Sequence, residues 1–145
     1  MAYAAQLRRE LSRKSLRSVI RYFRRARFLI PSAAMRLDDL SKDEQLALGG
    51  LIRLMLRSDG EFTDAEEEKV NQIGARLADP QRLWSVISAS AQAHMSDASI
   101  RTAAESVLRP EVRALVREVL TEVARDGSVT ESEQKLLDWL TSIWK

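Results

Sequence analysis

Apolar and basic positions near the amino terminus follow a helical period. At about 100° per residue, the apolar side chains between residues 12 and 30 fall on one side of a helix; they are Leu16, Val19, Ile20, Phe23 and Ile30. The opposite side is basic and holds Arg13, Lys14, Arg17, Arg21, Arg24 and Arg25. Pro31 ends the pattern, because the residue before a proline is disfavoured in helical backbone. The pattern predicts a basic amphipathic helix, followed by a linker at about residues 31–40.

The rest of the chain carries helix start signals at regular intervals. Three are capping boxes, in which a Ser or Thr is followed three residues later by Glu; they begin at Ser41, Thr63 and Thr130. The others are Asp79 before Pro80, Ser96, and Pro110. With their caps, the predicted helices span residues 41–58, 63–78, 79–94, 96–108, 110–125 and 130–145. No segment alternates convincingly with period two, so we expect an all-α helical bundle of six helices, with the amino-terminal helix as a seventh.

Composition agrees with a helical domain. The 145 residues are 45% hydrophobic and 30% charged, and five Gly and three Pro supply little turn chemistry for a sandwich or barrel. Without cysteine, disulfides and thiolate metal sites are excluded. The sequence has no run of about 18 apolar residues that would cross a membrane. Arginine also interrupts the amino-terminal apolar positions, unlike a signal peptide, so we expect a cytoplasmic protein.

Charge divides the chain in two. Residues 1–36 hold ten Lys or Arg and one acid, Glu10, for a net charge of +9. Residues 37–145 hold thirteen Lys or Arg and twenty acids, for a net charge of −7, and the two parts give the overall +2. We therefore predict a basic arm, residues 1–36, joined to an acidic helical domain, residues 37–145.

An internal repeat lies within the predicted domain. Residues 59–66 (DGEFTDAE) match residues 126–133 (DGSVTESE), 67 positions later. Flanking apolar positions also correspond, in the pairs Ile52 and Val119, Leu56 and Val123, Val70 and Leu137, Ile73 and Leu140. The repeat predicts a bundle of two related helix–turn–helix halves.

Most of this motif has a structural explanation. Its glycines stand where a helix end favours a left-handed residue, and its Thr and Glu cap the next helix. Phe62 and Val129 are expected to pack in the core. Asp59 and Asp126 are explained less well, because an anion at a helix carboxyl terminus faces the negative end of the helix dipole.

A cation site is the alternative explanation. The motif resembles the second half of an EF-hand calcium loop, in which a carboxylate precedes Gly and a Glu closes the site. The first half is missing, since Met55 and Arg57 occupy the earlier ligand positions of the first copy. A site shared between the copies stays open. It requires a hard divalent cation such as calcium, held by Asp59, Glu66, Asp126 and Glu133.

At these residues the sequence resembles the tellurite-resistance TerB-like domain family. The resemblance rests on the Asp-Gly, apolar, Glu signature in each half of residues 41–145. It implies a helical bundle of two similar halves, a divalent-cation site at the four acidic residues above, and a place in membrane-associated stress complexes or as a module joined to other domains. Ser58 and Arg125 stand where the family usually has Ala, and an Arg at 125 is able to pair with Asp126 in place of a metal.

Other chemistry is sparse, and we expect no enzyme. The single histidine, His94, lies near a predicted helix end without a second histidine or a cysteine for zinc. The sequence lacks a nucleophile elbow and a glycine-rich phosphate loop. Three tryptophans at positions 84, 139 and 144 are expected in the core or an interface. The apolar stripe of the last helix is expected to pack against the helix containing residues 51–56.

The arm is the main candidate for binding. Its basic face and Phe23 suit an acidic partner protein, an oligomer neighbour or a multi-subunit complex. Docking on its own domain and binding to an anionic membrane surface are alternatives. Nucleic acid is disfavoured, because the acidic domain repels a phosphate backbone. We therefore predict a non-enzymatic interaction module that uses Arg13, Arg17, Arg21, Arg24, Arg25 and Phe23; the alternative is a divalent-metal-binding stress-response protein.

Overall fold

Six α-helices form where the capping residues predict them. The computed structural model describes residues 35–58, 62–124 and 129–145. Its elements are η2 (Leu37–Asp39), α3 (Lys42–Arg57), α4 (Asp64–Leu77), α5 (Pro80–Ala93), α6 (Asp97–Glu105), α7 (Pro110–Ala124) and α8 (Glu131–Ile143). This part of the chain contains no strand, which confirms the all-α prediction. The predicted arm helix, with its arginines and Phe23, lies outside the described residues.

The predicted caps are formed by hydrogen bonds. Ser41 Oγ accepts the N–H of Glu44 at 3.2 Å, and Glu44 Oε1 accepts the N–H of Ser41 at 2.7 Å. Asp79 Oδ1 accepts the N–H of Arg82 at 2.8 Å. Ser96 caps α6 in the same way. These bonds satisfy amide groups that the first helical turn leaves without a partner.

One helix is shorter than its sequence predicts. Helix α6 ends at Glu105 rather than near Leu108. The residue before Pro110 is disfavoured in helical backbone, and α7 begins at that proline, so the chain needs a short connection between the two helices. Within this connection Val107 is buried, whereas the side chain of Leu108 is 74% exposed.

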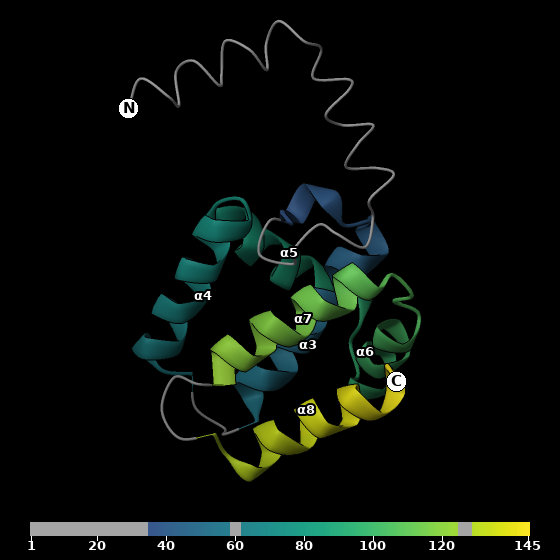
Figure 1. Cartoon of the computed structure of the whole chain (residues 1–145). Helices are drawn as coiled ribbons and strands as arrows, with labels where there is room; N and C mark the ends of the chain where they lie inside the picture. The colour runs from purple at the N-terminus through teal and green to yellow at the C-terminus, as the bar shows by residue number, and fades with distance from the viewer. Residues whose placement is uncertain (1–34, 59–61, 125–128) are drawn as a thin grey trace, which may run out of the picture. The chain divides into compact units, whose positions relative to one another are not determined.

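Helix α3 is the centre of the bundle and packs against α5, α6 and α7 (Figure 1). Helix α4 packs on α5 and α7, and α8 packs on α7. Because α3 has neighbours on several sides, Leu48, Leu51 and Ile52 are fully buried. The core is apolar and is shared by all six helices. No helix among the described residues is both long and apolar enough to cross a membrane.

The segment before α3 belongs to the core, and the predicted linker is wrong there. Met35, Leu37 and Leu40 are buried, and residues 37–39 form a 3-10 turn. The side-chain amide of Gln45 donates to the carbonyls of Leu37 and Leu40, at 2.9 and 3.2 Å. Their apolar spacing matches neither a helix nor a strand, so periodicity alone does not reveal that this segment packs.

Candidate functional site

Two of the four predicted cation ligands, Glu66 and Glu133, lie in the first turns of α4 and α8 and bond to the threonines that cap these helices. Thr130 Oγ1 accepts the N–H of Glu133 at 3.2 Å, and Glu133 Oε1 accepts the N–H of Thr130 at 3.1 Å. Thr63 Oγ1 accepts the N–H of Glu66 at 3.2 Å and donates to Glu66 Oε1 at 3.1 Å. Both glutamates are buried. The predicted capping box of α8 is therefore confirmed, whereas at α4 only the half of the box made by the Thr63 hydroxyl is shown.

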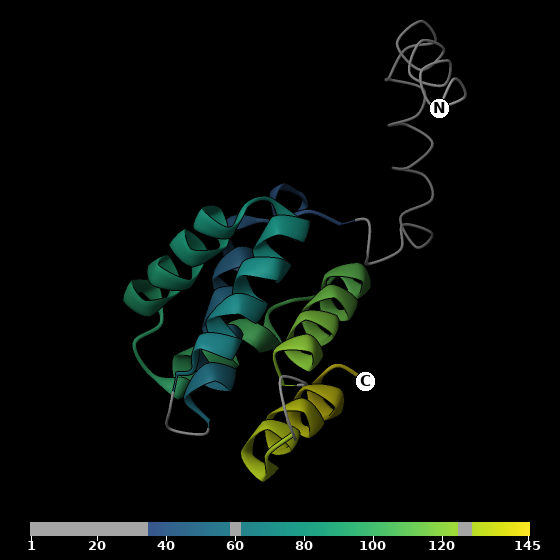
Figure 2. The same ribbon diagram turned by 90° about the vertical axis from the view of Figure 1, so that its left-hand side faces the viewer.

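Two of the four predicted cation ligands cannot be placed. Asp59 and Asp126 lie outside the described residues. Helices α4 and α8, whose first turns contain Glu66 and Glu133, begin at the same end of the bundle (Figure 1, Figure 2). Among the described residues no group of three or more His, Asp or Glu side chains is arranged to hold a metal ion. The shared cation site stays a prediction.

The apolar residues of the repeat are exposed, and the expectation that they pack in the core is wrong. Phe62 is 53% exposed and Val129 is 42% exposed. Each precedes the Thr that caps a helix, where the backbone is still extended, so its side chain does not share the buried face of the helix that follows. The ring of Phe62 meets Trp84 edge-on, with centroids 6.0 Å apart.

The three tryptophans differ in their surroundings. Trp144 is buried and its indole N–H donates to the carbonyl of Ala104 in α6 at 3.0 Å. Trp84 is half-buried and donates to Asn71 Oδ1 at 2.7 Å. Trp139 is half-buried below the guanidinium of Arg101, 4.4 Å from the ring centre. Helix α8 packs mainly on α7 rather than on α3, which differs from the predicted packing.

His94 has a local structural contact. Its Nδ1 lies 2.9 Å from Ser99 Oγ, across the connection between α5 and α6. Arg53 Nη1 donates to the carbonyl of His94 at 3.2 Å. These bonds hold the connection against α3.

A buried glutamate and an arginine form an ion pair with two hydrogen bonds. Arg109 Nε donates to Glu44 Oε2 at 2.9 Å, and Arg109 Nη2 donates to Glu44 Oε1 at 2.7 Å. The hydrogen bond from Arg109 is the main cause that lowers the pKa of Glu44, against the opposing effect of burial. In turn, the hydrogen bond with Glu44 raises the pKa of Arg109. The sequence identifies Glu44 as a cap but contains no local signal for Arg109, because the two residues meet only in the folded chain.

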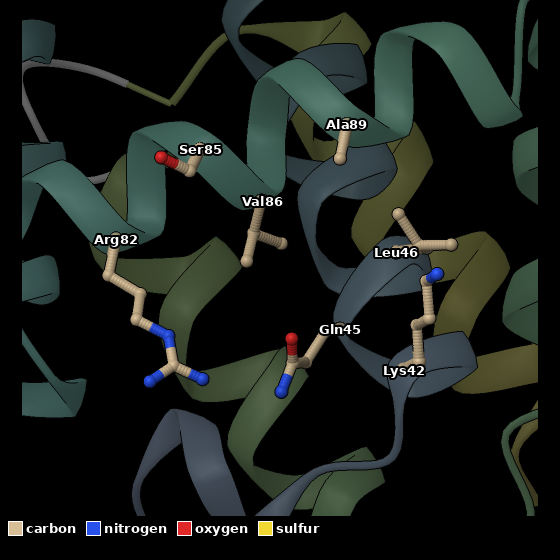
Figure 3. Close-up of a pocket in the computed structure, with 7 residues that line it drawn as sticks. All are labelled: Lys42, Gln45, Leu46, Arg82, Ser85, Val86 and Ala89. Carbon is tan, nitrogen blue, oxygen red and sulfur yellow. The ribbon is translucent and has the colours of Figure 1, made fainter.

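An open cleft lies between the amino-terminal half of α3 and helix α5 (Figure 3). The helices approach most closely at Gly49, where an added Cβ would lie 2.9 Å from the carbonyl oxygen of Val86. The cleft opens beside this contact and has a volume of about 270 Å³. Leu46 of α3 faces Val86 and Ala89 of α5 across it (Figure 3).

Two cations lie on opposite sides of this cleft, namely Lys42 of α3 and Arg82 of α5 (Figure 3). The guanidinium of Arg82 forms an ion pair with Asp38 at the exposed surface. The apolar lining and the two cations together make the cleft the candidate binding site of the described residues.

A second cleft, of about 260 Å³, lies among α3, α6 and α8. It is crossed by an ion pair between Arg57 and Asp97 at 2.9 Å. Its cations are therefore already partnered or stacked on an aromatic ring, as Arg101 is on Trp139.

Comparisons with protein-family models, with curated proteins and with solved structures give no match to this chain.

Proposed function

We propose that the chain is a non-enzymatic interaction module of the TerB-like type, which binds an acidic partner protein or complex through its basic arm. The observation that carries the proposal is the separation of charge. The arm has a net charge of +9 and the rest of the chain has −7. Such a segment attracts an acidic surface over a distance of about 8 Å at physiological ionic strength.

The packing of the domain is consistent with separate roles for a folded domain and a binding arm. Each of the helices α3–α8 contributes a fully buried apolar side chain, so the domain has an apolar core of its own. Thr63 and Thr130 occupy corresponding positions of the repeat, and each accepts the N–H of the glutamate three residues later at the start of its helix, which supports two related halves. In this proposal the apolar stripe Leu16, Ile20 and Phe23 contacts the partner, because an isolated helix of this length is marginal in water and is stabilised when its apolar face is covered.

The test compares two full-length triple variants. In one, Arg17→Glu, Arg21→Glu and Arg24→Glu reverse the basic face; in the other, the same positions become Lys and keep their charge. After affinity capture from the source cells, quantitative mass spectrometry should find an acidic protein or complex with the wild type and the Lys variant, and not with the Glu variant. The melting temperatures should agree, and added salt should weaken capture.

Three results would contradict this proposal. A Glu variant that melts well below the wild type would make the arm part of the fold. Binding of the purified wild type to vesicles containing anionic lipid, with no protein captured, would favour a membrane surface. Equal capture by both variants would exclude the basic face as the binding element.

A divalent-cation site is the second candidate function. It is favoured by the common end of the bundle at which α4 and α8 begin, with Glu66 and Glu133 buried there (Figure 1). If Asp59 and Asp126 complete a site, calcium should raise the melting temperature and EDTA should reverse the rise. The double variant Asp59→Asn, Asp126→Asn should lose the response.

Exposed acids of the same helices serve as a matched control. Asp64→Asn with Glu131→Gln removes two charges from the first turns of α4 and α8. This control should keep the calcium response. No thermal shift of the wild type at millimolar calcium would leave capping as the role of Glu66 and Glu133.

A further inference from the structure

The two cations beside the α3–α5 cleft lie at helix amino termini, where a positive charge is unfavourable. Lys42 is the first residue of α3, and Arg82 is in the first turn of α5. A helix amino terminus carries partial positive charge, so a cation there is mildly unfavourable. Two such placements on opposite sides of one cleft concentrate positive potential at its mouth (Figure 3).

Nearby acids neutralise this charge only in part. Asp38 pairs with Arg82, but the side chains are 69% and 45% exposed, so the pair is weak and readily exchanged. Lys42 has no ion pair with the described residues. The carboxylate of Glu44 is engaged by Arg109. Asp43 is exposed and does not line the cleft.

The size of the cleft limits what it holds. Its volume of about 270 Å³ is just below the usual range of small-molecule sites, about 300–1,000 Å³. Leu46, Val86 and Ala89 present apolar surface to it. One apolar side chain of a partner fits this space better than a cofactor. A neighbouring carboxylate on the same segment would lie near Lys42 or Arg82.

We propose that this cleft binds a short acidic segment of the partner, with an apolar side chain between α3 and α5 and carboxylates beside Lys42 and Arg82. This inference rests on the proposed function, because it assigns the folded domain a second contact with the same acidic partner. The arm of this chain is a poor occupant, since residues 1–34 hold nine Lys or Arg and one acid.

The connection to the arm favours joint binding. The described chain begins at Met35, and Asp38, three residues later, pairs with Arg82 at the cleft. If the arm holds the partner, the covalent link between the arm and the domain raises the effective concentration of the partner at the cleft. Two weak contacts then give a stronger combined interaction than either alone.

The experiment titrates a synthetic peptide, Glu-Glu-Leu-Leu-Glu-Glu with blocked ends, into the isotopically labelled full-length protein and follows backbone amide signals by NMR. We expect shifts at Leu46, Ser85 and Ala89. Lys42→Glu should weaken binding roughly five- to tenfold, because it replaces attraction by repulsion. The variant should stay folded, since an acid at the first helical position suits the dipole.

Two control variants distinguish an effect at the cleft from the effect of a changed net charge and from the effect of a larger side chain on a helix. Lys135→Glu makes the same change of charge on α8 and should bind the peptide like the wild type. Ala89→Leu should fill the cleft and weaken binding, whereas Ala75→Leu, at an exposed position of α4, should not. A peptide with Ser in place of both Leu should bind more weakly.

The proposal is overturned if peptide shifts avoid the cleft, if Lys42→Glu and Lys135→Glu bind alike, or if the Ser peptide binds equally well. It is also overturned if vesicles with anionic lipid shift the cleft signals and the peptide does not. The arm variant with three Glu should keep the cleft shifts. If that variant still captures the native partner while the cleft binds peptide, the proposed function of the arm fails and the cleft proposal stands.

Discussion

Glu44 and Arg109 lie 65 positions apart in the sequence and form a two-pronged ion pair, with nitrogen–oxygen distances of 2.9 and 2.7 Å. Arg109 Nη2 also donates to the carbonyl of Asp39 at 2.7 Å. Glu44 Oε1 accepts the N–H of Ser41 as part of the α3 cap. The pair therefore joins three places: the segment before α3, the first turn of α3 and the start of α7.

This pair makes stability depend on pH in acid. Arg109 lowers the pKa of Glu44 from its ordinary value of 4.5. Because the pKa is lower in the folded chain than in the unfolded one, the stabilisation is complete above pH 4.5 and is lost as the pH falls below it. Glu44→Gln keeps a cap acceptor but removes the charge. At neutral pH its free energy of unfolding should be lower by about 1–2 kcal/mol.

Urea unfolding followed by circular dichroism measures this difference. The gap between the wild type and Glu44→Gln should narrow as the pH is lowered below 4.5. Glu111→Gln is the matched control, because Glu111 lies 3.8 Å from Arg109 Nη1 in a looser pair. Its effect should stay below about 0.5 kcal/mol. An equal decrease in the free energy of unfolding for the two variants would show that the Glu44–Arg109 pair contributes no more than the looser Glu111–Arg109 pair.

Gly49 should be sensitive to the addition of one methyl group. An added Cβ would lie 2.9 Å from the carbonyl oxygen of Val86 and 3.2 Å from the Cα of Ile87. Both are backbone atoms, so α3 and α5 would have to separate. Although alanine favours helix by up to about 1 kcal/mol, we expect Gly49→Ala to lower the free energy of unfolding by about 1–3 kcal/mol.

The neighbouring glycine supplies the comparison in chemical denaturation. The three atoms nearest to a Cβ at Gly50 would all belong to the side chain of Ile100, the closest at 3.1 Å. Because a side chain adjusts at lower cost than two packed helix backbones, Gly50→Ala should cost clearly less than Gly49→Ala. Equal costs would mean that the α3–α5 contact tolerates displacement, contrary to the close approach seen between these helices.

Local chemistry explains what the sequence predicts well. Capping bonds join residues three positions apart, so Ser41, Asp79 and Thr130 mark helix starts without knowledge of the fold. Pro110 acts in the same local way. Helix periodicity also indicates which face is buried. These signals are sufficient for the all-α class and for most helix boundaries.

Contacts between distant segments account for what could not be predicted. Arg109 becomes a partner of Glu44 only once α7 lies beside α3. Met35 and Leu37 are buried because the segment before α3 packs on the bundle. The apolar spacing of this segment has no period that predicts such packing. Phe62 matches the apolar pattern of the repeat but lies outside the helix that the pattern describes. The α3–α5 cleft likewise depends on how two helices cross, which is set by the tertiary packing around Gly49.

The caps of the repeat should contribute to stability with or without metal. Thr63→Ala and Thr130→Ala each remove the acceptor of a first-turn N–H, at 3.2 Å in both helices. Each should lower the free energy of unfolding by about 0.5–2 kcal/mol, both in EDTA and in calcium. Thr130→Ser keeps the hydroxyl and should stay close to the wild type. A loss seen only in calcium would make the metal, rather than the cap, the source of the effect.

Trp144 should anchor α8 through its ring more than through its hydrogen bond. The indole donates to the carbonyl of Ala104, but that carbonyl also accepts the N–H of Val107 at 3.2 Å, so removal of the indole does not orphan it. The guanidinium carbons of Arg113 and Arg117 lie 5.9 and 5.8 Å from the centre of the ring. Trp144→Phe should therefore lower the free energy of unfolding by about 1–2 kcal/mol. Trp144→Ala should lower it by about 3–5 kcal/mol, because it leaves a buried cavity.

Trp139 supplies the control. Trp139→Phe, at a half-buried position, keeps an aromatic ring for Arg101 and should lower the free energy of unfolding by less than about 1 kcal/mol. Urea unfolding measures all three, and a Trp144→Phe variant as unstable as Trp144→Ala would show that the hydrogen bond, and not the ring, holds α8 in place.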